Sequence, residues 1–170
     1  SQWLKDNQEL VIGDVQDVEK LDQTILGAEV VYNFAALADL NQAVEEPIKT
    51  VNINILGNLN VMEACRAHGI KRFIYASTVY VHSREGGFYS CSKQASEAYV
   101  EEYQKTYGLD YTILRYGSLY GPRADETNGL YRVVRSALKN GVISYEGDAD
   151  AMREYIHVDD AARASIDALN

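Results

Sequence analysis

The sequence has few of the residues that cross-link or stiffen a small domain, since it holds two cysteines and two prolines in 170 residues. Two cysteines cannot build a disulfide framework, and three scattered histidines give no metal-ligand spacing, so we expect no metal site. No apolar run approaches the roughly 20 residues that span a bilayer. No charged-then-apolar leader opens the chain either. These absences predict a cytoplasmic protein without a membrane partner.

Basic residues are also in short supply, with 16 Lys and Arg against 25 Asp and Glu and a formal net charge of −9. Binding to phosphate backbones needs clustered Lys and Arg, so the charge argues against a nucleic-acid partner. Apolar residues make up 46% and charged residues 24%, as in ordinary globular proteins. The length suits one domain, with room for the start of a second.

Apolar runs alternate with segments of helical period along the chain. We expect strands at residues 10–12, 28–36, 73–76, 111–114 and 142–145, and helices at 48–67, 90–107, 128–139 and 161–169. Strands that alternate with helices of this length form βαβ units around a parallel sheet. The predicted fold class is therefore α/β, with a doubly wound parallel sheet and helices on both of its faces.

The sharpest local feature is Tyr89 followed four residues later by Lys93, at the start of a predicted helix. This spacing puts the phenol and the ammonium on one helical face. A nearby cation stabilises a phenolate and is expected to lower the pKa of Tyr89, which would let the phenol exchange protons with a substrate. Upstream, Ser77 and Thr78 follow a predicted strand, and ligands bind at the carboxyl ends of strands in such sheets.

A Ser/Thr pair at a strand end followed by YxxxK resembles the extended short-chain dehydrogenase/reductase superfamily, in particular its NAD-dependent sugar-nucleotide epimerases and dehydratases. Five further segments resemble that family in the expected order: residues 13–15 (GDV), 33–36 (NFAA), 54–64 (NILGNLNVMEA), 115–123 (RYGSLYGPR) and 153–160 (REYIHVDD). The resemblance implies a Rossmann-like core. It divides the chain into a cofactor-binding core, residues 1–118, and the start of a substrate-binding lobe with returning core elements, residues 119–170.

The resemblance also assigns roles to residues. Thr78 would hydrogen-bond the reacting sugar oxygen, Tyr89 would be the general base or acid, and Lys93 would hold the nicotinamide ribose. Ser77 is the competing hydroxyl. The implied cofactor is NAD rather than NADP, bound by Asp14, Val15, Phe34, Ala35, Ala36, Leu37, Asn54, Tyr89 and Lys93. The implied substrate is a nucleotide-diphosphate sugar, bound by Thr78, Ser118, Arg123 and Arg153.

The sequence departs from the family pattern in several places. No glycine-rich strand-to-helix turn is present to cradle a pyrophosphate, so we expect a fragment truncated at its N-terminus that binds NAD weakly by itself. The connection 79–88 is short, and we expect an altered active-site mouth. Val79 replaces the acidic pair of 4,6-dehydratases, which argues against 4,6-dehydration. Ser118 replaces an Asn that contacts substrate in many members.

We therefore expect epimerisation through a transient keto-sugar. The alternatives are a decarboxylase or reductase on the same scaffold, or a non-catalytic NAD-binding or scaffold protein. A homodimer is expected through helices 48–67 and 90–107. Tyr99, Tyr103 and Tyr107 form a stripe along the second of these helices, which fits either core packing against the sheet or a dimer interface.

Overall fold

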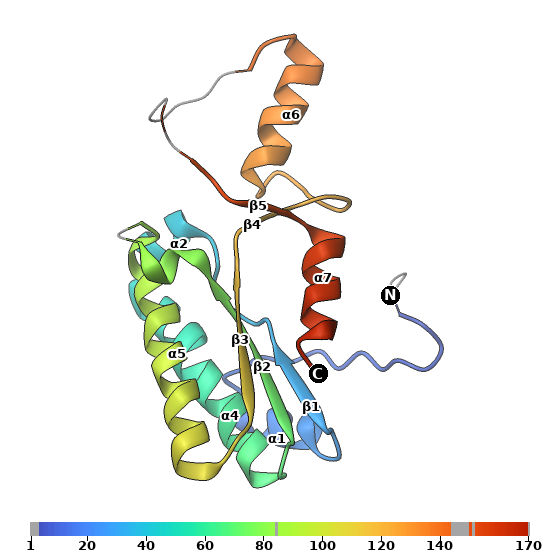
Figure 1. The fold of residues 1–170 in the computed structure, drawn as a ribbon, viewed down its shortest axis with the longest axis vertical. Helices are drawn as coiled ribbons and strands as arrows, with labels where there is room; N and C mark the ends of the chain where they lie inside the picture. The colour runs from blue at the N-terminus through green and yellow to red at the C-terminus, as the bar shows by residue number, and fades with distance from the viewer. Residues whose placement is uncertain (1–3, 84, 144–149, 151, 170) are drawn as a thin grey trace.

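A computed structural model describes residues 4–83, 85–143, 150 and 152–169. Its centre is a three-stranded sheet of order β1-β2-β3, formed by β1 (Val30–Asn33), β2 (Arg72–Thr78) and β3 (Tyr111–Tyr116). Both pairings are parallel, so the three strands end at the same edge of the sheet (Figure 1). That edge carries the residues on which the sequence analysis places the chemistry.

Helices cover both faces of this sheet, as expected for a doubly wound fold (Figure 1). On one face lie α4 (Gly57–Ala67) and α5 (Gly87–Tyr107), with α1 (Val18–Ile25) packed against α4. On the other lies α7 (Val158–Asp167), where the Ser165 backbone accepts a hydrogen bond from Tyr32 of β1. The core between the sheet and the first helical layer includes fully buried Met62, Cys65 and Phe73.

The predicted helix 48–67 is present, but it changes geometry along its length. It begins as α3 (Pro47–Val51), widens into a π-helical turn, η1 (Asn52–Leu56), and continues as α4. A π-turn breaks the regular backbone ladder and is often found beside functional sites. Here the Asn54 carbonyl accepts a 2.8 Å hydrogen bond from the Ser96 hydroxyl of α5, which fastens the turn to its neighbour.

A smaller parallel sheet stands apart from the first, with β4 (Ser118–Tyr120) paired to β5 (Tyr155–His157). Between these strands in the sequence lies α6 (Gly129–Asn140). The expected boundary between residues 118 and 119 lies inside β4, one residue after that strand begins. Beyond the smaller sheet, α7 packs against the main one.

Several predicted elements need correction. Residues 10–12 form no strand: Leu10, Val11 and Ile12 are exposed, and no described strand lies beside them to supply the backbone partners that a strand requires. The predicted strand 142–145 falls partly outside the described residues, and 142–143 are irregular. Two short helices were missed, α1 and α2 (Leu40–Glu45), although Asp17 and Asp39 cap them through side-chain hydrogen bonds.

Among the described residues, none of the helices combines the length and apolar character needed to cross a bilayer.

Candidate active site

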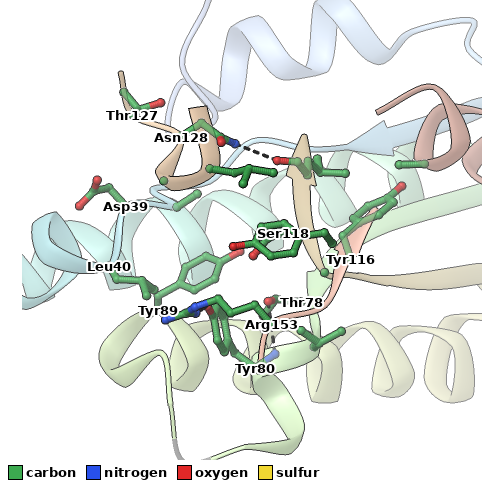
Figure 2. A pocket seen from close by; sticks show the side chains of 18 of the residues that line it. Asp39, Leu40, Thr78, Tyr80, Tyr89, Tyr116, Ser118, Thr127, Asn128 and Arg153 are labelled. Carbon is green, nitrogen blue, oxygen red and sulfur yellow. Dashed lines mark hydrogen bonds between the residues drawn. The ribbon is translucent and has the colours of Figure 1, made fainter. Parts of the chain in front are cut away.

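A cavity of about 1640 Å³ opens at the carboxyl ends of the main sheet, between that sheet and the smaller one. Figure 2 shows side chains from both parts of the chain pointing into it. Its walls come from the ends of β1, β2 and β3, the first turn of α5, α2, β4, the start of α6, and α7. Of the predicted site residues, it brings together Phe34, Ala36, Thr78, Tyr89, Lys93, Ser118 and Arg153.

Tyr89 lies in the first turn of α5, because that helix begins at Gly87 rather than at the predicted residue 90. The early start depends on Gly86, whose φ of +87° is left-handed backbone that suits glycine. The Tyr89 phenol faces Thr78, which ends β2 and is 5% exposed. The short connection after β2 therefore brings the tyrosine to the threonine.

The structure also separates the two hydroxyl residues at the end of β2. The Thr78 side chain lies close enough to the Tyr89 phenol to lower the pKa of that phenol. Ser77 is also buried, but its hydroxyl acts on the carboxylate of Glu97, whose pKa it helps to lower. Adjacent residues of a strand point in different directions, and here Thr78 is the one that meets the tyrosine.

The expected lowering of the Tyr89 pKa is wrong for this structure. Burial raises the pKa of Tyr89, and the nearby Tyr80 raises it further, against the opposing effect of Thr78. The Lys93 ammonium lies 5.9 Å from the centre of the Tyr89 ring. The ammonium donates its hydrogen bond to a backbone carbonyl instead. The spacing along the helix therefore predicted that Lys93 lies near Tyr89, but not which group the ammonium binds.

Lys93 is buried, with 2% of its surface exposed, and its ammonium donates a 2.7 Å hydrogen bond to the carbonyl oxygen of Ala76. The ammonium also lies 4.7 Å from the centre of the Tyr75 ring, where the face of the ring attracts a cation. Burial lowers the pKa of Lys93 to about 8, while the charge of Glu97 acts in the opposite direction. The lysine is thus held rigidly beneath the cavity with a proton that it binds less firmly than usual.

Glu97 lies one helical turn beyond Lys93 and is 7% exposed. Its carboxylate accepts hydrogen bonds from Nε and Nη2 of Arg115 on β3, the shortest at 2.6 Å. Burial raises the pKa of Glu97, but the Arg115 hydrogen bonds and the Ser77 side chain outweigh that effect and leave it lowered. A permanent negative charge is therefore fixed close to the buried lysine.

On the β1 side of the cavity, the strand leads into Phe34 and two alanines. Phe34 is 55% exposed and stacks on Tyr32 with ring centres 6.0 Å apart. Ala36 lines the cavity, while Ala35 and Leu37 are outside its lining. The Ala35 amide donates to the Asn33 side chain at 3.1 Å, which fixes the exit of the strand.

Asn54 does not line the cavity, although the resemblance makes it a cofactor contact. Its side chain is buried and holds the backbone of Leu37 at both polar groups: Oδ1 accepts from the Leu37 amide at 2.7 Å, and Nδ2 donates to the Leu37 carbonyl at 3.0 Å. Nδ2 also donates to Ser92 Oγ at 2.9 Å. Asn54 therefore joins the loop after β1 to α5, and its effect on the cavity passes through that loop.

Asp14 and Val15 lie beyond the lining of the cavity, on the chain that precedes α1. Val15 packs on the start of α4, where a Cβ added to Gly57 would come within 2.5 Å of Val15 Cγ2. The Val15 carbonyl also accepts a 3.0 Å hydrogen bond from Asn60. Asp14 is exposed and accepts from the Gln16 amide. Gly57 is thus the residue that allows this segment to approach α4.

On the substrate side, Ser118 and Arg153 line the cavity and Arg123 does not. Arg153, two residues before β5, donates a hydrogen bond from Nη1 to the hydroxyl of Tyr80 in the turn after β2. Arg123 lies on the exposed turn before α6 and has a φ of +74°.

Several lining residues were not predicted from the sequence, and among them Tyr80, Asp39 and Asn128 carry polar groups at the cavity. Asp39 and Asn128 show a recognisable signal, since each is the N-cap of a helix. Asp39 is the one carboxylate among the described lining residues, and it accepts from the Gln42 amide. No group of three or more His, Cys, Asp or Glu residues in the described ranges is arranged to hold a metal ion.

Comparisons with known proteins agree on one family. The model of the NAD dependent epimerase/dehydratase family matches residues 1–170. The chain is 32% identical to a putative UDP-glucose 4-epimerase of Methanocaldococcus jannaschii over 95% of the chain and 59% of that protein. It is 29% identical to a dTDP-glucose 4,6-dehydratase of Streptomyces antibioticus over 88% of the chain and 49% of that protein.

Solved structures give the same result. A UDP-glucose 4-epimerase of Thermotoga maritima, crystallised with UDP-glucose, matches with a TM-score of 0.89 and 28% identity, over 98% of this chain and 60% of that one. A UDP-glucose 4-epimerase of Thermus thermophilus in complex with NAD matches with a TM-score of 0.81 and 32% identity, over 92% and 58%. The chain therefore spans between about half and three fifths of the length of these relatives.

Proposed function

The chain belongs to the NAD-dependent epimerase/dehydratase family, and on that premise we propose that the full-length protein epimerises a nucleotide-diphosphate sugar through a transient keto-sugar. One observation carries the proposal: Thr78, Tyr89 and Lys93 arise on two different elements and converge at one cavity at the carboxyl ends of the sheet. A protein that only binds NAD has no need of a proton-transfer group beside a second hydroxyl and a buried ammonium.

The division of labour follows from the contacts. Tyr89 exchanges a proton with the reacting sugar hydroxyl, and Thr78 hydrogen-bonds the same oxygen, since the two side chains line one cavity and Thr78 already acts on the Tyr89 phenol. Lys93 anchors α5 to β2 through the Ala76 carbonyl, which keeps the Tyr89 phenol beside Thr78. Tyr89 is partly buried in the wall of the cavity, where a bound sugar can reach its hydroxyl.

The residues present also fit a bound NAD. What the cofactor supplies is a reversible acceptor for a hydride from the sugar carbon. Phe34 and Ala36 offer an aromatic face and a small side chain at the end of β1. Lys93 has three N–H groups, of which Ala76 takes one, and the other two suit the vicinal hydroxyls of a ribose. Asp14 and Val15 would border the adenine from the segment before α1, where Val15 packs on the start of α4.

Epimerisation is favoured over 4,6-dehydration by the charges at the cavity. Elimination of water needs an acid near the hydroxyl residue, but Val79 follows Thr78. Asp39, the one carboxylate among the described lining residues, accepts a hydrogen bond from the helix that it caps. Loss of water therefore lacks a proton donor of the required kind beside Thr78.

Incubation of the full-length protein with NAD and a panel of UDP- and dTDP-sugars tests the proposal. We expect transient absorbance of NADH together with a product that differs from its substrate at one carbon. A product lacking carbon dioxide would identify a decarboxylase, and stoichiometric oxidation of added NADH would identify a reductase. Binding of NAD with no change in any sugar would identify the non-catalytic alternative.

We also propose that the full-length protein is a homodimer. Within the stripe of tyrosines, Tyr103 packs against the core, whereas Tyr99 and Tyr107 are 45% and 55% exposed. The adjacent helices add exposed apolar side chains, with Ile48 at 73% and Leu56 at 49%. A second copy of the chain is the partner that we assign to this surface. Helices paired across a dimer can bury the exposed tyrosines of α5 together with the exposed aliphatic side chains of α3 and η1.

A further inference from the structure

Tyr80 belongs to the short turn η2 (Val79–His82), directly after the catalytic Thr78. Nothing in the sequence analysis assigned it a role, yet its ring lies in the cavity beside Tyr89 and Arg153. Figure 2 shows the phenol at the same end of the cavity as Thr78. The contacts of Tyr80 indicate what this second phenol does.

The backbone of Tyr80 is fastened at both polar groups. Its amide donates to Thr78 Oγ1 at 3.3 Å. Its carbonyl accepts from the Ser90 hydroxyl of α5 at 2.9 Å and from the Ser83 amide at 3.0 Å. The turn therefore cannot shift without disturbing both β2 and α5.

The ring of Tyr80 is also confined. A Cβ added to Gly86 would come within 3.1 Å of Tyr80 Cβ and 3.2 Å of its Cγ, so the glycine is what allows the short connection to pass so close. The connection of residues 79–88, which the sequence analysis marked as unusually short, thus places this one side chain. Because Gly86 lies against the base of the ring and the backbone is fastened at both polar groups, the direction of the Tyr80 side chain is restricted.

That hydroxyl accepts a hydrogen bond from Nη1 of Arg153, which lies just before β5. Arg153 is otherwise exposed, on a long side chain that loses entropy when it is fixed. A guanidinium carries five N–H donors in a planar fork that matches phosphate oxygens. One bond to Tyr80 orients the fork and leaves donors for an anion.

We propose that Tyr80 is a substrate-positioning residue, which holds the Arg153 guanidinium at the cavity so that its remaining N–H groups bind the diphosphate of the nucleotide sugar. The inference rests on the proposed function for the identity of the anion. Beyond that function, Tyr80 becomes a residue of the substrate site, and the short connection 79–88 is what places it there. Arg153 is set in place before the substrate arrives, so binding does not have to order it.

Calorimetric titration of the full-length protein with UDP and with dTDP tests this without any turnover. Tyr80→Phe removes one oxygen and keeps the ring, and Tyr99→Phe on the exposed face of α5 is the matched control. We expect Tyr80→Phe to raise Kd for the better nucleotide about ten-fold, since hydrogen bonds to charged groups are among the stronger ones. Tyr99→Phe and the affinity for NAD should not change.

A double-mutant cycle with Arg153→Gln separates positioning from a general effect on the fold. In the Arg153→Gln background, Tyr80→Phe should have little further effect on Kd. In the otherwise unsubstituted protein, Tyr80→Phe should raise KM for the nucleotide sugar more than it lowers kcat. An unchanged Kd in Tyr80→Phe, or an equal loss with and without Arg153, would overturn the inference while leaving the proposed function intact. Failure of the unsubstituted protein to bind either nucleotide would overturn both.

Discussion

The Lys93 ammonium donates a 2.7 Å hydrogen bond to the carbonyl oxygen of Ala76, which ties α5 to β2 just before the two hydroxyl residues. This bond fixes the distance between the helix that carries Tyr89 and the strand that carries Thr78. It also satisfies a buried charge with one neutral acceptor, so the lysine binds its proton weakly. Structure and chemistry of the site therefore depend on the same contact.

The first prediction concerns Tyr89→Phe in the full-length protein. Loss of the phenolic oxygen removes proton transfer, so kcat should fall about 10²- to 10⁴-fold. The aromatic ring stays, and the melting temperature should move by no more than about 4 °C. Stopped-flow absorbance of NADH measures the first effect and calorimetry the second. Retention of most of kcat would exclude Tyr89 as the proton-transfer group.

The second prediction is a pH dependence. Burial lowers the pKa of Lys93 to about 8, so the ammonium loses its proton as pH rises through 8. We expect kcat/KM to fall as the pH rises above about 8. Stability runs the other way: the unfolded chain binds the proton more tightly than the folded one, so burial of the lysine is destabilising below pH 8, and this cost diminishes as pH rises from 8 towards 10.5.

Glu97→Gln supplies the discriminating variant for that profile. The charge of Glu97 raises the pKa of Lys93, so its removal should move the alkaline fall of kcat/KM to lower pH. Glu102→Gln, on the exposed face of the same helix, is the control and should leave the profile in place. A profile that is the same in Glu97→Gln and the unsubstituted protein would show that Lys93 does not govern the alkaline limb.

The elements of the main sheet could be predicted because their signals are local. The continuous apolar run at 28–36 and the helical period at 48–67 both give the right type of element. The π-turn at Asn54 could not be predicted, since its geometry is maintained by hydrogen bonds to Leu37 and Ser96, far away in the sequence. At residues 10–12 the sequence predicted a strand that is absent. The β-forming side chains are there, but no described strand lies beside them.

The site shows the same division between local and distant information. Spacing alone brings Tyr89 and Lys93 together, because one helix carries both. The direction of the Tyr89 pKa could not be derived from that spacing, since burial by the surrounding chain is the largest effect on it and raises it. Tyr80 and Arg153 meet across 73 residues of sequence, and only the folded chain makes them neighbours.

The third prediction tests the close approach of Val15 to α4. Gly57→Ala would put a methyl group within 2.5 Å of Val15 Cγ2, and the segment that carries Asp14 and Val15 must move outward. We expect a loss of about 1–3 kcal/mol in the free energy of unfolding and an increase in Kd for NAD. Gly129→Ala is the stability control, because its Cβ would meet nothing closer than 3.9 Å. An unchanged Kd would remove Val15 from the cofactor site.

The last prediction addresses the homodimer through α3, η1 and α5. Tyr103 is a poor test of it, because its hydroxyl donates to Glu63 at 2.6 Å and a new carboxylate there would repel Glu63 within the monomer. Tyr99→Glu and Ile48→Glu change side chains that are 45% and 73% exposed, so they should leave the monomer folded.

In a dimer these two positions are buried, and an unpaired carboxylate placed there is strongly destabilising. We therefore expect sedimentation velocity at micromolar concentration to give a dimer for the unsubstituted protein and a monomer for both variants. Leu138→Glu changes an apolar side chain of α6 that is 84% exposed, and it should leave the dimer unchanged. Dissociation by Leu138→Glu alone would move the interface to α6. A monomeric unsubstituted protein would mean that the exposed tyrosines and aliphatic side chains of α3, η1 and α5 face water in solution.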